Sequence, residues 1–189
     1  MKQKFFSRWF AIGMIAAALV MIGCSKDDKD NKNDEPAPPP RNAVMIDGET
    51  KPIIGARIKE GPLVGNNYGM FIIYLSESEY VRIGSEQHHD GQTIDLTKKE
   101  PERDGWYWSV EYVKSGKIIF DTYADPNQQS HPVFQSGTLY IKRLDDVDGQ
   151  LVFEIELKNG KVKGEGDYGD GKEHTISLYY KGKLELGEF

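Results

Sequence analysis

Ile176-Ser177-Leu178-Tyr179-Tyr180-Lys181-Gly182-Lys183-Leu184-Glu185-Leu186 carries the clearest strand pattern in this chain of 189 residues. Its large apolar side chains share one face, with Gly182 between them: Ile176, Leu178, Tyr180, Leu184 and Leu186. The other face consists of Ser177, Tyr179, Lys181, Lys183 and Glu185. Successive side chains of a β-strand point to opposite faces, so this alternation predicts a strand with one face buried and the other in water.

The same alternation recurs towards the amino end. Leu151, Phe153, Ile155 and Leu157 alternate with Val152, Glu154, Glu156 and Lys158. Trp106, Trp108, Val110 and Tyr112 alternate with Tyr107, Ser109, Glu111 and Val113. Shorter runs predict further strands over 43–47, 52–59, 68–75, 79–84, 92–97, 117–123, 138–144 and 161–167.

Turn dipeptides separate these runs. Six of them place Gly after Asp or Asn, which suits the positive φ angles of tight hairpins: 47–48, 90–91, 104–105, 148–149, 159–160 and 170–171. An apolar stripe at helical spacing is missing, and short helical turns are expected only near 77–80 or 125–129. The sequence therefore predicts an all-β domain, an antiparallel meander of about 8 to 10 strands. It leaves open a barrel (calycin-like) or a two-sheet sandwich.

The amino end has the composition of a removable leader. Lys2, Lys4 and Arg8 precede an apolar or small run from Trp9 to Ile22, and Gly23-Cys24 follows it. A membrane-spanning helix needs about 18 to 20 apolar residues, so this run is better suited to a signal peptide. Residues 1–23 are expected to be the signal peptide, with Cys24, the single cysteine, as the lipidated first residue of the mature protein.

Residues 24–41 predict a tether. Ser25 to Glu35 has almost no apolar side chain and cannot form a core, and Pro36 to Arg41 favours a semi-rigid polyproline II spacer. The single β domain is then expected over 42–189. With one cysteine in the chain, no intrachain disulfide holds this domain together.

The leader, with Met21 in place of the usual Leu of a lipobox, resembles that of bacterial lipoproteins, and Ser25-Lys26-Asp27-Asp28 resembles the acidic export signal of Bacteroidota surface lipoproteins. Residues 136–141, 149–155, 170–172 and 180–184 are similar in order to small β-rich lipoproteins of that group, which are barrel-like or sandwich-like and mostly of unassigned function. The resemblance implies a lipid anchor in the outer membrane and exposure at the cell surface, and it assigns no catalytic residue.

Charge excludes one class of partner. The chain has 24 Lys and Arg and 30 Asp and Glu, and loss of the three basic residues in 1–23 leaves 21 bases against 30 acids, a net charge of −9. An acidic domain lacks the basic surface that nucleic-acid binding requires. We expect no nucleic-acid partner, and attachment to the membrane only through the anchor.

Aromatic side chains are the strongest indication of recognition. Trp106, Tyr107, Trp108 and Tyr112 are the candidate ligand-binding residues, since on a regular strand Tyr107 faces away from the two tryptophans. One face then belongs to the core and the other offers a stacking platform for a sugar or a peptide.

Two other constellations are weaker. His88 and His89 are adjacent in an expected loop and are candidate metal or haem ligands, although a closed site needs three or four ligands. Glu154 and Glu156 share one face of a strand, as the acid and nucleophile of a glycosidase would, but such a face is also an ordinary solvent-side position. Nucleophile, phosphate-loop and dinucleotide motifs are absent from the sequence.

These observations favour a non-catalytic domain without a cofactor, which binds a glycan, a peptide or a membrane complex in the cell envelope. A glycan-active hydrolase and a haem- or metal-capturing lipoprotein are the alternatives.

Overall fold

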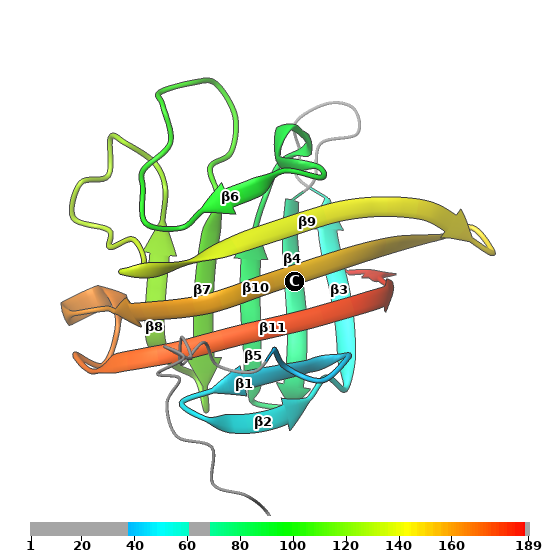
Figure 1. The fold of residues 1–189 in the computed structure, drawn as a ribbon, viewed down its shortest axis with the longest axis horizontal. Coiled ribbons are helices and arrows are strands. Elements are labelled where there is room, and N and C mark those ends of the chain that lie inside the picture. The colour runs from blue at the N-terminus through cyan, green and yellow to red at the C-terminus, as the bar shows by residue number, and fades with distance from the viewer. Residues whose placement is uncertain (1–37, 61–68, 188–189) are drawn as a thin grey trace, which may run out of the picture. The chain divides into compact units, whose positions relative to one another are not determined.

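The computed structural model describes residues 38–60 and 69–187. Within them the chain forms two six-stranded sheets, which face each other with their strands crossing steeply (Figure 1). The all-β prediction is confirmed. Of the two architectures that the sequence left open, the structure has the two-sheet sandwich, with twelve strands in the described residues rather than about 8 to 10.

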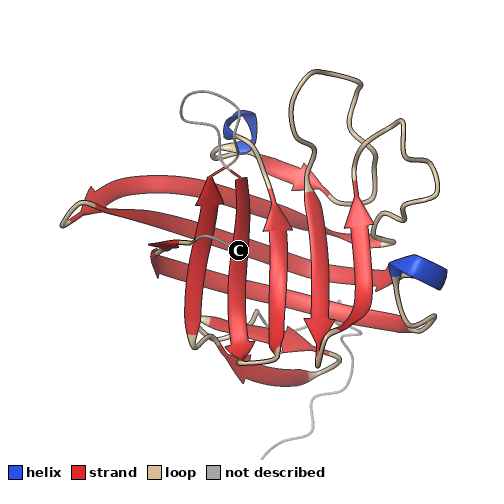
Figure 2. Ribbon diagram, turned by 180° about the vertical axis from the view of Figure 1, so that it is seen from behind, coloured by secondary structure: helices blue, strands red, loops and turns tan. Residues whose placement is uncertain are grey.

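The first sheet has the order β2-β1-β11-β10-β9-β6. Its strands are β1 (Ala43–Ile46), β2 (Glu49–Pro52), β6 (Thr93–Asp95), β9 (Ser136–Val147), β10 (Gln150–Lys163) and β11 (Glu173–Lys183). The second sheet has the order β12-β3-β4-β5-β7-β8. Its strands are β3 (Gly55–Glu60), β4 (Gly69–Ser76), β5 (Glu79–Gly84), β7 (Ser109–Lys114), β8 (Lys117–Tyr123) and β12 (Glu185–Leu186). Two short 3₁₀ helices, η1 (Gln87–His89) and η2 (Gly166–Tyr168), complete the described elements (Figure 2).

The inward faces of the two sheets make one core. Trp108, Phe71, Phe120 and Phe153 are its largest fully buried side chains. Phe71 of β4 and Phe153 of β10 meet edge to face across the two layers, with ring centroids 5.0 Å apart. Such aromatic contacts bury large apolar areas and fix the distance between the sheets without a disulfide.

The strand pattern from Ile176 to Leu186 holds as far as Leu184. Ile176, Leu178, Tyr180 and Leu184 are buried as predicted, but β11 ends at Lys183, and Glu185 and Leu186 pair in parallel with β3 of the other sheet. The prediction for Leu186 is therefore wrong, because its side chain is 69% exposed. The chain leaves the first sheet here and continues on the edge of the second, which forms a corner of the sandwich.

The turn dipeptides were only partly interpreted correctly. Asp47-Gly48 and Asp148-Gly149 form hairpin turns with both residues at positive φ, and Ser115-Gly116 forms a third that the sequence analysis missed. Asn159-Gly160, in contrast, is no hairpin: β10 continues through it, with a shift of register between Leu157 and Gly160. A bulge requires the same backbone freedom as a turn, which is why the dipeptide misled the prediction.

Gly160 gives a test of this bulge. A Cβ at this position would lie 2.8 Å from Leu157 Cδ2 and 2.9 Å from both Ile176 Cγ2 and the Ile176 carbonyl oxygen, so Gly160→Ala is expected to destabilise the fold by about 1–3 kcal/mol. Gly55→Ala in β3 is the matched control, since its nearest neighbour, Tyr74 Cδ2, is 4.0 Å away. Urea unfolding of both variants measures the difference, and equal stabilities would contradict the packing at the bulge.

Candidate functional site

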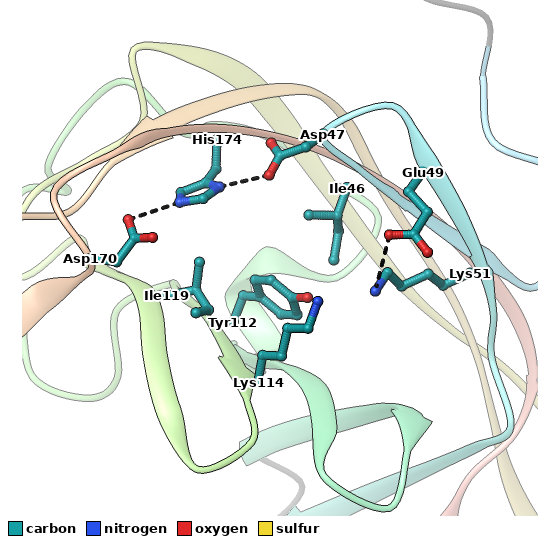
Figure 3. Close-up of a pocket in the computed structure, with 9 residues that line it drawn as sticks. All are labelled: Ile46, Asp47, Glu49, Lys51, Tyr112, Lys114, Ile119, Asp170 and His174. Carbon is teal, nitrogen blue, oxygen red and sulfur yellow. Dashed lines mark hydrogen bonds and ion pairs between the residues drawn. The ribbon is translucent and has the colours of Figure 1, made fainter.

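A pocket of 220 Å³ opens at one end of the sandwich, between the β1–β2 hairpin of the first sheet and strands β7 and β8 of the second (Figure 3). We call it the end pocket. It is lined by Ile46, Asp47, Glu49, Lys51, Tyr112, Lys114, Ile119, Asp170 and His174. Six of these nine side chains are acidic or basic, in contrast to the apolar core beside them.

His174 is the second residue of β11 and follows the connection from η2. Its ring lies between two carboxylates. Its Nδ1 is 2.8 Å from Asp47 Oδ2, and its Nε2 is 3.0 Å from Asp170 Oδ1 (Figure 3). A carboxylate can only accept, so each ring nitrogen must carry a hydrogen to make both bonds. The geometry therefore favours the doubly protonated, positively charged ring.

The pKa values agree with this geometry. Burial lowers the pKa of His174, but the hydrogen bonds and charges of Asp47 and Asp170 outweigh burial and raise it above its usual value. The hydrogen bond from His174 in turn lowers the pKa of Asp170. Protonated His174 thus links the β1–β2 turn to the segment before β11.

A second ion pair joins the two sheets beside the pocket. Lys51 Nζ of β2 donates to Glu79 Oε1 of β5 at 2.6 Å, and the Tyr112 hydroxyl of β7 donates to the same oxygen. The Lys51 and Glu79 side chains are only 13% and 12% exposed. Burial raises the pKa of Glu79, but the hydrogen bonds from Lys51 and Tyr112 lower that pKa by more than burial raises it, so the carboxylate stays charged. Burial and the neighbouring Glu79 raise the pKa of Tyr112, so its hydroxyl stays protonated.

The predicted aromatic platform is not formed. Residues 106–108 precede β7, and Tyr107 and Trp108 are both buried. Trp108 packs against Phe134 and Tyr107 against Tyr123, so neither ring is open to a ligand. Trp106 is half-buried. Tyr112 is buried too, and of the four candidates it is the one that lines the end pocket. The structure therefore places these aromatic side chains mainly in the core.

A third residue, Glu100, lies beside His88 and His89, and the sequence alone did not indicate it. His88, His89 and Glu100 hold their possible ligand atoms within 4.8 Å of one another, and Arg103 bonds Glu86 at 2.6 Å and Glu100 at 3.3 Å beside them. Glu100 lies eleven residues after His89 in an irregular segment, so no spacing rule pointed to it.

Hydrogen bonding within this cluster disfavours a metal. The Glu86 backbone N–H donates to His89 Nδ1 at 3.2 Å, and Ser85 Oγ is 3.1 Å from the same nitrogen. An amide N–H can only donate, so Nδ1 has no hydrogen and Nε2 must carry it, donating to Glu100. A metal on Nε2 would move that hydrogen to Nδ1, directly against the amide. The hydrogen bonds therefore hold His89 as a structural ring.

The carboxylate pair on β10 also lacks the chemistry of a glycosidase. The Tyr179 hydroxyl donates to Glu154 at 2.8 Å and lowers the pKa of that carboxyl, with Lys181 at 3.1 Å assisting. Glu156 pairs with Lys158 at 3.1 Å. A glycosidase needs a protonated carboxyl beside an ionised one. Glu154 is held ionised and cannot be the acid, and Glu156 is engaged by a lysine, so neither side chain is marked as the acid of such a pair.

Comparison with protein-family models, with curated proteins and with solved structures finds no match to this chain. Among residues 38–60 and 69–187 there is no helix with the length and apolar character needed to cross a bilayer. Cys24 and the leader lie outside the described residues.

The charge of His174 gives a pH-dependent prediction. Its folded pKa is raised above the ordinary 6.5, so its stabilisation is fully present below about pH 6.5 and is lost as the pH rises through the folded value. His174→Gln is expected to cost about 1 kcal/mol at pH 5.5, a small figure because Asp47 and Asp170 are partly solvated, and less at pH 9.

Urea unfolding at the two pH values measures this difference. Asp148→Asn is the matched control, a turn aspartate whose partner in the structure is Lys183 at 3.0 Å. A loss of stability in His174→Gln that is the same at pH 5.5 and pH 9 would show that the ring is not charged.

Proposed function

We propose that this chain is a lipid-anchored domain of the cell envelope, which binds a small ligand in the end pocket without transforming it. Residues 1–24 support the anchor by their composition, and the acidic and proline-rich residues that follow support a tether to the outer membrane. The β domain that this tether would carry has its own core.

The binding function rests on one observation: the ionisable side chains in and beside the end pocket are held in fixed protonation states by one another. Both nitrogens of His174 are used by carboxylates, Glu79 is held charged by Lys51 and Tyr112, and Asp170 is held charged by His174. Proton transfer to a ligand would require these groups to leave the partners that they already bind, since both nitrogens of His174 contact carboxylates and Glu79 is bound by Lys51. We therefore propose that they recognise charge rather than transfer protons.

The charges also indicate the class of ligand. Lys114, on the inward face of β7, makes no hydrogen bond or ion pair with its side chain to any residue that the structure describes, and Glu49 has most of its side chain in water. An ammonium and a carboxylate at the mouth of so small a pocket match a small zwitterion. We infer a short peptide with free ends, one of the ligand classes that the sequence favours.

Free dipeptides test this inference. The full chain, expressed with its own leader and purified in a mild detergent, is expected to bind dipeptides in calorimetry, and Lys114→Met to bind them at least tenfold more weakly. Lys117→Met, an exposed lysine at the start of β8 outside the pocket, should bind as the wild type does. Equal affinity for N-acetylated, amidated dipeptides, or release of free amino acids, would contradict the proposal.

Cys24 tests the anchor independently of the ligand. Cys24→Ala is expected to abolish labelling by radioactive palmitate and to shift the protein from the membrane fraction to the soluble fraction, because the acyl chains supply the membrane affinity. Ser25→Ala is the control and should keep the label. A Cys24→Ala protein that stays labelled would remove the anchor from the proposal.

A further inference from the structure

The outward face of the second sheet carries an unusual row of side chains. Arg57 of β3 pairs with Ile72 of β4, Ile72 with Arg82 of β5, Arg82 with Glu111 of β7, and Glu111 with Asp121 of β8. Directly paired residues in a sheet share a face, so these five form one line across five strands, about 19 Å long. Figure 2 shows this sheet from its outer side. We call the line the outer row.

Two carboxylates lie next to each other in this row. Glu111 and Asp121 are directly opposite on β7 and β8, and their side chains are 13% and 26% exposed. Arg82 Nη1 is 2.6 Å from Glu111, and His131 Nε2 is 3.3 Å from Asp121. Burial raises the pKa of both carboxyls. Like charges in opposed positions oppose sheet formation, so packing alone gives no reason for this pair.

Flat groups surround the row. Tyr74 and Tyr80 lie side by side with ring centroids 6.2 Å apart. Arg57 lies over the ring of Tyr74 at 5.7 Å, and Arg82 over that of Tyr80 at 5.4 Å. Both tyrosines are half-buried. Planar rings and guanidinium groups therefore cover this face where small or flexible polar side chains would normally stand.

The other end of the row is closed by a rigid loop. Lys99 Nζ donates to the carbonyl oxygens of Tyr123, Gln128 and His131 at 2.7, 3.0 and 2.9 Å, which fixes the loop that carries His131. The His131 ring lies 4.0 Å from that of Tyr168 between centroids. Among the residues that the structure describes, Arg82 Nε and His131 Nδ1 are buried without a hydrogen-bond partner, one beside each carboxylate of the pair.

We propose that the outer row, with Tyr74, Tyr80, His131 and Tyr168, is a second binding surface, and that its ligand is a neutral oligosaccharide. A sugar hydroxyl both donates and accepts, so one ring can donate to Asp121 and accept from Arg82. The C–H groups of the sugar pack on the half-exposed rings of Tyr74 and Tyr80. A polyanion would meet Glu111 and Asp121, and a polycation would meet Arg57 and Arg82, so the balanced charges select a neutral chain. This surface is on the outside of the sheet whose inner face lines the end pocket, and it goes beyond the function proposed for that pocket.

Four neutral hexasaccharides are the probes: maltohexaose, cellohexaose, xylohexaose and N-acetylchitohexaose, with a hyaluronan hexasaccharide as the anionic comparison. Calorimetry on the full chain in mild detergent is expected to show binding of at least one neutral probe. Asp121→Asn and Tyr80→Ala should each weaken that binding at least tenfold. Asp121→Asn keeps the shape of the side chain, so it remains informative where Tyr80→Ala unfolds.

Glu156→Gln is the matched control, because Glu156 is also 26% exposed and faces outward, but on the first sheet. It should bind the probe as the wild type does, and so should Lys114→Met. Failure of all four neutral probes, tighter binding of the hyaluronan hexasaccharide, or unchanged affinity in Asp121→Asn would overturn the proposal. Loss of saccharide binding in Lys114→Met would place the saccharide in the end pocket and would also overturn the proposal. Loss of dipeptide binding alone in that variant concerns the end pocket and does not affect the proposal for the outer row.

Discussion

The inward faces of β5 and β7 change from apolar to charged towards one end of the second sheet, and the end pocket depends on this change. On β5 the inward positions are Ile83, Val81 and then Glu79; on β7 they are Val110, Tyr112 and then Lys114. The apolar side chains pack on the first sheet, whereas the charged side chains at the end of each row cannot be buried in a dry core without a partner. The sheets can stay together at that end only because Lys51 of the first sheet neutralises Glu79 of the second.

This arrangement explains why the end pocket exists. A buried ion pair is held at a desolvation penalty, and replacing it with apolar side chains is often neutral or favourable for stability. A continued apolar face on β5 and β7 would have closed the sandwich at this end. The charged residues instead leave space between the sheets, and the Asp47–His174–Asp170 contacts hold the rim of that space in place. Stability is given up locally for an open, charged site, which is the usual signature of a functional region.

The sequence predicted the strands better than the sites, for a physical reason. Alternation is a local pattern, so β5, β8, the first part of β10 and the later part of β11 were found from their own residues. The end pocket joins residues 47, 112 and 174, and only the sheet topology brings them together. The one local signal was a charged residue at the end of an otherwise apolar face, as in Lys114. Trp106 to Trp108 failed as a binding platform for another reason: the segment lies outside β7, and Tyr107 is covered by tertiary contacts that no local pattern shows.

Three histidines show how partners, rather than residue type, decide the chemistry of such a domain. His174 donates from both nitrogens to carboxylates and is held charged. His89 accepts a backbone N–H at Nδ1 and contacts Glu100 through Nε2. His131 contacts Asp121 through one nitrogen, and among the described residues its buried second nitrogen has no hydrogen-bond partner. The rings of Tyr123 and Tyr168 pack against His131, so aromatic packing rather than a second hydrogen bond fixes that side of the ring beside the outer row.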